Sequence, residues 1–180
     1  MSDAYKIHDQ QGVYFLTFRV IDWVDVFTRT QYKDVIISNL KYCIDNKGLE
    51  LYAYVIMTNH IHIIGRAKEN FKLSDFVRDF KKCRANQILE LIKQPCESRK
   101  WMLNHFIKAG QDNIRNKKLQ FWNQKNHAIE LYSPDFIDQK LNYIHENPVK
   151  AGFVEKPEDY LYSSARNYAD LDNLLDVIQI

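Results

Sequence analysis

Apolar and polar residues alternate along this chain in two distinct periods. Segments 13–20, 49–57 and 60–66 are rich in β-branched and aromatic residues, which favours strands. Segments 30–46 and 75–93 instead repeat apolar residues at helical spacing. The first half of the chain therefore predicts a strand, a helix, two strands and a second helix, in that order.

A basic, partly helical stretch follows over residues 98–118. Segments 119–122 and 127–131 then predict a strand pair, or one bent strand. The resulting β-α-β-β-α-β order is that of the ferredoxin-like split β-α-β fold. We therefore expect an α+β protein with an antiparallel sheet, helices on one face and the other face free to bind a ligand.

An extra helix is predicted near the C-terminus. Ser133 is a good cap residue, Pro134 suits the first helical position, and Asp135 places an acid in the first turn. We expect this helix to run to about Glu146, because the residue before Pro148 is pushed out of the helical region.

Composition narrows the class of protein. The 180 residues are 46% hydrophobic and 27% charged, which suits a single domain with a core over about 12–165 and a tail over 166–180. With a net charge of +2, a polyanion has to be bound by a local patch. No apolar run approaches the ~20 residues of a membrane span. Cys43, Cys83 and Cys96 fit reduced thiols, so we expect a soluble, cytoplasmic protein.

A histidine pair lies at the start of the third predicted strand. His60 and His62 are two residues apart, so they share one face of the strand while Ile61 points to the other. Their Cα atoms lie roughly 6.5 Å apart in an extended strand. Two neutral imidazoles at this spacing can converge on one divalent cation. The alternative is a pair of polar residues on a solvated sheet face.

The C-terminal helix carries a second polar pair. Tyr143 and Asn147 are four residues apart and therefore neighbours on one stripe, with Lys140 beside them. A phenol, a neutral oxygen donor and two imidazoles make a plausible set of one nucleophile and three metal ligands. The alternatives are a boundary tyrosine, a helix C-cap and a solvated lysine.

Two motifs resemble the single-tyrosine HUH transposases. They are VIMTNHIHII over residues 55–64 and YIHENPVKAGFV over residues 143–154. The ending PEDYLYSSA, over residues 157–165, is similar to the REP-associated branch of that family. The resemblance extends from the first strand to Ser164, and its specificity comes from both motifs occurring in this order.

The resemblance implies a metal-dependent DNA transposase that cleaves and rejoins single-stranded DNA with hairpin ends. In the family's pattern, His60 and His62 match the paired ligands of Mg²⁺ or Mn²⁺, and Asn147 matches the third ligand. Tyr143 matches the nucleophile, which forms a 5′-phosphotyrosine and a free 3′-OH. Because that phosphodiester retains the bond energy, another 3′-OH can reverse the step without ATP.

Basic and aromatic residues supply candidates for DNA binding. One predicted helix carries Arg78, Lys81, Lys82 and Arg84, and Lys140 lies beside Tyr143 on another. A second basic cluster comprises Arg99, Lys100, Lys108, Arg115, Lys117 and Lys118, and candidate stacking residues are Trp101, Phe121 and Trp122. Relatives often carry a Lys-Phe-Thr-like segment where residues 80–84 here read FKKCR, so a hydroxyl role is in doubt there. The alternative is that the charges are solvated and the aromatic residues belong to the core.

Two other functions fit parts of the pattern. One is a catalytically inactive ferredoxin-like module that binds single-stranded nucleic acid, although decay should have removed at least one residue of the set. The other is a metal phosphodiesterase with an activated water, which normally needs more carboxylate ligands. A homodimer is also compatible, because insertion-sequence members commonly exchange the tyrosine helix between subunits whereas REP-associated members need not.

Overall fold

The computed structural model describes residues 6–112, 119–124 and 127–180, without the side chains of Cys83 and Arg84. Its strands are β1 (Tyr14–Arg19), β2 (Leu49–Ile56), β3 (His60–Ala67) and β4 (His127–Glu130). Its α-helices are α1 (Thr30–Asn46), α2 (Leu73–Lys93), α3 (Trp101–Gln111), α4 (Pro134–Lys150) and α5 (Ala165–Tyr168). Short 3₁₀ turns are η2 (Ile21–Trp23), η3 (Val26–Thr28) and η4 (Pro157–Asp159). The predicted β-α-β-β-α-β order is confirmed, with α3 inserted before β4 and α4 added after it.

The four strands form one antiparallel sheet in the order β2-β3-β1-β4. Its register sets which side chains share a face. Thr17 of β1 lies opposite His62 of β3, and Phe18 lies opposite Ile61. Since side chains alternate along a strand, the first pair faces one side of the sheet and the second pair the other.

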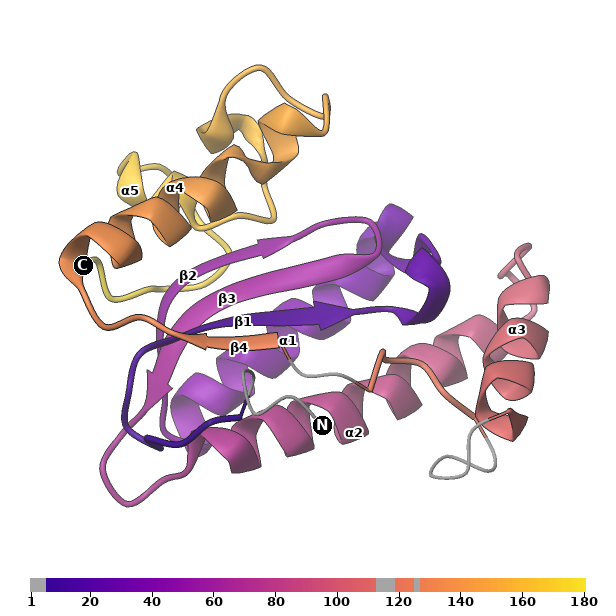
Figure 1. Cartoon of the computed structure of the whole chain (residues 1–180). Helices are drawn as coiled ribbons and strands as arrows, with labels where there is room; N and C mark the ends of the chain where they lie inside the picture. Colours follow the sequence, from indigo (N-terminus) through magenta and orange to yellow (C-terminus); the bar gives the residue numbers. More distant parts are fainter. Residues whose placement is uncertain (1–5, 113–118, 125–126) are drawn as a thin grey trace.

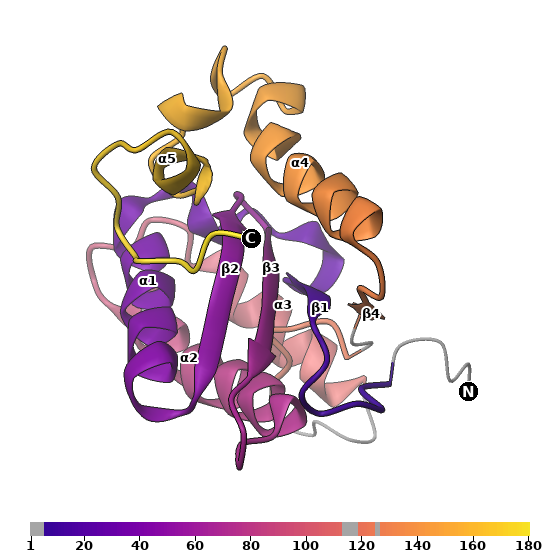
Figure 2. The ribbon, with the colours of Figure 1, turned by 90° about the vertical axis from the view of Figure 1, so that its left-hand side faces the viewer.

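The sheet lies between two helical layers. Helices α1 and α2 cover one face, and α4 lies on the opposite face (Figures 1 and 2). On the α2 side, the Phe18 ring packs 4.5 Å from Phe80 and 6.3 Å from Phe76, measured between ring centroids. The face that we expected to be free therefore carries the C-terminal helix.

The segment 119–122 does not form the predicted strand. Within the described part of the chain, its ladder pairing is limited to an isolated bridge between Val20 and Trp122. The side chains of Phe121 and Trp122 are both buried, and the Phe121 carbonyl accepts a hydrogen bond from the backbone of Ile21. The apolar pattern over residues 119–122 therefore belongs to an irregular segment that packs into the core, and not to a strand.

The end of α4 also differs from the prediction. The helix continues through Asn147 and Pro148 to Lys150, and the chain turns at Gly152, whose φ is +74°. Pro148 and Ile144 are buried, so packing against the sheet compensates for the hydrogen bond that the proline cannot donate. The continuous helix keeps Asn147 in helical register with Tyr143.

The C-terminal segment protects the free edge of β2. The Ile56 amide donates to the Tyr162 carbonyl at 3.0 Å, and the Ser164 amide donates to the Tyr54 carbonyl at 2.9 Å. An isolated bridge also joins Val55 to Ser163. An exposed edge strand is a template for aggregation, and this return of the chain satisfies its backbone groups.

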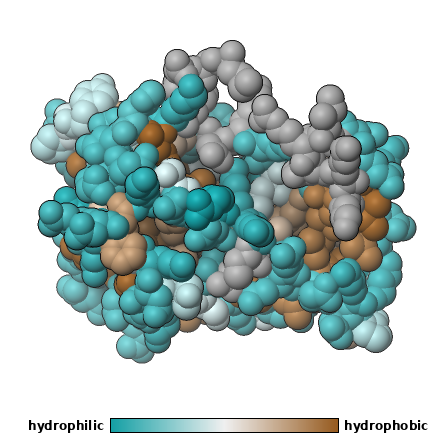
Figure 3. All heavy atoms as spheres, turned by 90° about the horizontal axis from the view of Figure 1, so that it is seen from below, coloured by the Kyte–Doolittle hydropathy of each residue, from teal (hydrophilic) through white to brown (hydrophobic). Residues whose placement is uncertain are grey.

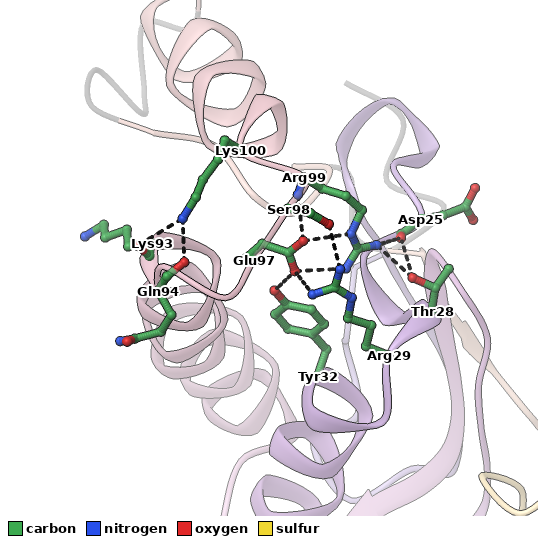
Figure 4. Close-up of polar contacts among 10 residues, drawn as sticks. All are labelled: Asp25, Thr28, Arg29, Tyr32, Lys93, Gln94, Glu97, Ser98, Arg99 and Lys100. Atoms are coloured by element: carbon green, nitrogen blue, oxygen red, sulfur yellow. Dashed lines mark hydrogen bonds and ion pairs between the residues drawn. The ribbon is translucent and has the colours of Figure 1, made fainter.

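A buried ion network, the Glu97 network (Arg29, Tyr32, Glu97 and Arg99), joins the start of α1 to the segment before α3 (Figure 4). The Glu97 carboxylate is fully buried and accepts hydrogen bonds from Arg29 at 3.2 Å, Tyr32 at 2.5 Å and Arg99 at 3.1 Å. Burial alone would raise the pKa of Glu97, but the hydrogen bonds from Arg99 and Tyr32 outweigh it and lower the pKa to about 2.

Candidate functional site

The two histidines of β3 lie side by side on the face that α4 covers. Their ring centroids are 4.8 Å apart. His62 is 5% exposed, whereas His60 is half-buried at the start of the strand. The expected same-face arrangement is therefore present, but on a partly enclosed surface instead of a solvated one.

Both imidazoles are oriented through their Nδ1 atoms. Nδ1 of His62 lies 2.9 Å from Oγ1 of Thr17, and Nδ1 of His60 lies 2.7 Å from Oδ1 of Asn59. Asn59 uses its amide nitrogen to donate to Asp25 at 2.8 Å, so its oxygen faces the histidine. His60 therefore carries its proton on Nδ1 and directs a lone pair from Nε2, as a metal ligand requires.

Burial keeps both histidines neutral. Burial lowers the pKa of His62 to about 3, with further lowering from electrostatic interactions with His60 and Lys140. The pKa of His60 is also lowered by burial, partly offset by a hydrogen bond with Asn147. At neutral pH both side chains are in the form that binds a metal ion.

Helix α4 brings the second polar pair against the first. The Tyr143 ring lies 5.3 Å from the His62 ring, and Asn147 lies close enough to His60 to affect its pKa. The match follows from geometry: four helical residues rise about 6 Å, and two strand residues span about 6.6 Å. These four residues, which we call the histidine–tyrosine site, meet from segments about 80 residues apart.

Two residues of this surface were not anticipated from the sequence. Phe15 stacks on His62 with 5.0 Å between centroids and meets the edge of Tyr143 at 5.8 Å. Thr17 orients His62, as described above. Both occupy alternate positions of β1, so the strand period combined with the β1–β3 register would have identified them.

Lys140 lies one turn before Tyr143 and faces the same rings. Its Nζ atom is 5.1 Å from the centroid of Phe15 and 5.7 Å from that of Tyr143. Tyr143 remains 42% exposed. The phenol is therefore accessible to a substrate and has a cation near its ring.

The donor set fits a cation that also binds an anionic substrate. Within the described part of the chain, no three His, Cys, Asp or Glu side chains gather to hold a metal ion. The available donors are the two imidazoles and the carboxamide oxygen of Asn147, all neutral. Such a set could hold a divalent cation and would leave coordination positions and positive charge for phosphate oxygens.

The described basic side chains of α2 do not join this site, because α2 covers the other face of the sheet (Figure 1). Arg78 is exposed and paired with Asp75 and Asp79. Lys81 is half-buried, its Nζ donates to the Asn123 carbonyl at 3.1 Å, and burial lowers its pKa to about 8. Lys82 is exposed. The Arg84 side chain lies outside the described residues.

The α2 side of the molecule is mostly hydrophilic, with separate hydrophobic areas (Figure 3). A DNA-binding role for these lysines and arginines stays a prediction, and it would engage a surface away from Tyr143.

Among the described residues, no helix has the length and apolar character needed to cross a membrane.

The second basic cluster is divided by the structure. Arg99 is part of the Glu97 network, Lys100 donates to the Gln94 carbonyl, and Lys108 is exposed on α3. Arg115, Lys117 and Lys118 lie outside the described residues. Of the three predicted stacking residues, Phe121 and Trp122 belong to the core, as the alternative interpretation held, whereas Trp101 is exposed.

Comparisons with known proteins bear on the family. The family model for IS200-like transposases matches residues 10–110, which include the histidine pair but not α4. A solved REP-associated tyrosine transposase bound to a REP hairpin matches 100% of this chain and 95% of its own, at 22% identity and a TM-score of 0.60. The crystal structure of a protein described as a putative transposase from Deinococcus radiodurans R1 matches 82% of this chain and 95% of its own, at 20% identity and a TM-score of 0.45. No curated protein matches.

The family match covers more than half of the chain. The solved transposase with its hairpin shares the fold over the whole length. Both findings agree with the resemblance seen in the two sequence motifs. This chain therefore belongs to the IS200-like transposase family.

Proposed function

We propose that this transposase cleaves single-stranded DNA with hairpin ends through Tyr143 and rejoins it by the reverse reaction. One observation carries the proposal: Tyr143 and Asn147 of α4 contact His62 and His60 of β3, one residue of each pair meeting one of the other. A nucleophile and a set of neutral ligands thereby share one partly enclosed surface.

In the cleavage step the phenolic oxygen of Tyr143 bonds to the scissile phosphorus, and the bond from phosphorus to the 3′-oxygen breaks. The phenol loses its proton and the departing 3′-oxygen gains one. The products are a 5′-phosphotyrosine and a free 3′-OH. Lys140 offers its ammonium group to the charge that develops near the ring. Attack by another 3′-OH reverses these bond changes and joins two strands.

His60, His62 and Asn147 would hold the Mg²⁺ or Mn²⁺ ion. When bound, such an ion orients the phosphate and offsets its negative charge. The chain's own contribution is orientation: Thr17 and Asn59 direct the two imidazoles, and Phe15 packs against both His62 and Tyr143. These contacts require little rearrangement before the substrate arrives.

The site is assembled within one chain. Tyr143 contacts the His62 of its own molecule, and α4 follows β4 through the short segment around Ser133. We therefore propose that the tyrosine acts on a phosphate bound by its own histidines. A homodimer remains compatible with this arrangement but is not needed to complete the site.

A covalent-capture experiment tests the proposal. The protein is incubated with end-labelled single-stranded hairpin DNA and Mn²⁺, then resolved on a denaturing gel. We expect a protein–DNA adduct that disappears in Tyr143→Phe and in His60→Ala. Tyr132→Phe is the matched control, because Tyr132 is a highly exposed tyrosine just before α4 and should leave the adduct unchanged.

Other outcomes would identify the competing functions. Hydrolysis without an adduct, unchanged in Tyr143→Phe, would contradict the proposal and indicate a phosphodiesterase. Salt-sensitive binding of every hairpin, with no cleavage in the presence of Mg²⁺ or Mn²⁺, would favour a nucleic-acid-binding module.

A further inference from the structure

A hollow of about 570 Å³ opens beside the histidine–tyrosine site, between the turn that follows β1 and the start of α3. Trp23 and Trp101 both line it, together with Asp22, Asp25, Arg99 and His105. Its volume lies within the range of small-ligand pockets. Nothing in the cleavage chemistry above uses this hollow.

Trp23 connects the hollow to the catalytic surface. Its indole and the His60 ring are in a T-shaped contact with 5.9 Å between centroids, and the guanidinium of Arg19 lies 4.4 Å from the indole centroid. Even so, the side chain is 53% exposed. A large indole held at the surface against a metal-ligand candidate is poorly explained by packing alone and is typical of a recognition surface.

The backbone that holds Trp23 at the surface is in an unfavourable conformation. Asp22 and Trp23 have φ values of 50° and 58°, so two consecutive non-glycine residues adopt the left-handed conformation. Such conformations persist only where the surrounding structure imposes them, and they concentrate at functional sites. The Trp23 carbonyl accepts a hydrogen bond from Asn59, which ties the turn to the residue that orients His60.

The opposite wall is also held in place. Trp101 begins α3 and is 55% exposed. Arg99 is held by Glu97 and donates to the Thr28 hydroxyl at 2.7 Å and to the Asp25 carbonyl at 2.9 Å (Figure 4). His105 joins the two walls through Asp22 at 3.0 Å. The hollow is therefore preorganised on both sides.

The lining chemistry selects a base over a phosphate. Indole faces stack on nucleobases of any sequence. The Asp22 and Asp25 carboxylates repel a phosphate. Each already bonds one protein group through one oxygen, and its second oxygen can accept a hydrogen bond from an exocyclic amino group. The guanidinium of Arg99 already has protein partners. We propose that this hollow binds an unpaired nucleobase bearing an amino group, next to the phosphate that Tyr143 attacks; this rests on the proposed function.

Binding without chemistry tests the hollow directly. In a Tyr143→Phe background, short single-stranded oligonucleotides are titrated while tryptophan fluorescence is followed. Trp122 is only 6% exposed, so quenching by a stacked base reports mainly on Trp23 and Trp101. Trp23→Ala and Trp101→Ala should each weaken binding roughly 5- to 150-fold, equivalent to about 1–3 kcal/mol per stacked base. Oligo-dC should bind more tightly than oligo-dT.

Matched variants separate base stacking in the hollow from a general effect of removing an exposed aromatic residue. Tyr42→Ala removes an exposed aromatic residue from α1, on the other side of the sheet, and should leave affinity unchanged. Trp23→Phe keeps a smaller stacking face and should give an intermediate loss. Unchanged affinity in both alanine variants, or an equal loss in Tyr42→Ala, would overturn the proposal.

The two proposals can fail separately. Tryptophan-dependent binding of oligonucleotides, together with no adduct from the otherwise unaltered protein, would retain the hollow and reject the tyrosine chemistry. Adduct formation together with affinity that is insensitive to both tryptophans would reject the hollow and retain the chemistry.

Discussion

Two polar clusters of this protein use similar side chains in opposite ways. In the Glu97 network, a buried carboxylate is surrounded by two guanidinium groups and a phenol, and its charge is neutralised within the protein. In the histidine–tyrosine site, the two imidazoles are neutral, the carboxamide carries no charge, and Tyr143 remains exposed. The first cluster is complete without a ligand, whereas the second is arranged to receive charge from outside.

The two clusters are physically connected. Arg99 donates to the Asp25 carbonyl at 2.9 Å, and the Asp25 carboxylate accepts from Asn59, which orients His60. The saturated network therefore supports the turn on which the open site depends. The difference teaches that a polar cluster is a functional candidate when its members lack partners within the protein, whatever the number of charges it contains.

Removing the carboxylate should give the largest change in stability. Glu97→Ala leaves two arginines and the buried Tyr32 hydroxyl without their shared partner. We expect the free energy of unfolding to fall by roughly 3 kcal/mol, because the charge-assisted hydrogen bonds are lost and the buried Tyr32 hydroxyl is left unsatisfied. Urea denaturation monitored by circular dichroism measures this loss.

Glu90→Ala is the matched control, because it breaks an exposed pair with Lys93 on α2. Surface pairs contribute about 0–1 kcal/mol, so its denaturation midpoint should hardly move. Equal effects of the two substitutions would contradict the distinction drawn between the buried network and ordinary surface charges.

The same network predicts how stability depends on acid. The pKa of Glu97 is about 2 in the folded protein, below its usual value of 4.5. A depressed carboxyl pKa contributes stability that is fully present above pH 4.5 and is lost as the pH falls from 4.5 towards 2. The stability difference between the unaltered protein and Glu97→Gln should therefore shrink across that window. Urea titrations at pH 6 and pH 3.5 compare the two proteins, and a constant difference would refute the assignment.

The residue that orients His60 should affect metal affinity more than stability. Asn59→Ala removes the oxygen partner of Nδ1, so the imidazole loses its fixed tautomer and direction. Loss of such a partner typically weakens metal binding about 10- to 100-fold. Calorimetric titration with Mn²⁺ measures this directly, with Asn46→Ala on α1 as a control away from the site. Unchanged Mn²⁺ affinity in Asn59→Ala would remove Asn59 from the site.

Much of this arrangement was accessible from the sequence. The strand period placed His60 and His62 on one face, and the helical period placed Tyr143 and Asn147 on one stripe. Both are local rules, and both hold in the structure. The continuation of α4 past Pro148 was not predictable, because it depends on packing between the helix and the sheet and not on local propensity.

Other features required long-range information. Asn59, Thr17 and Phe15 became part of the site only through strand register and turn geometry. The Glu97 network brings together residues about 70 positions apart, and neither their types nor their spacing indicates a pair. The position of α2 on the face of the sheet opposite α4 likewise depends on how the helices pack, so the sequence did not show that its basic residues lie away from Tyr143 (Figure 1).

The smallest expected effect concerns the start of α4. The Ser133 hydroxyl accepts a hydrogen bond from the Phe136 amide at 3.3 Å, as the cap prediction required. Ser133→Ala should lower the free energy of unfolding by about 1 kcal/mol. Tyr143 lies almost three turns further along the helix, where its position is set by contacts with β1 and β3. Adduct formation measured by covalent capture should therefore be unchanged. A strong loss of the adduct would instead mean that the helix start, and not the sheet, positions the nucleophile.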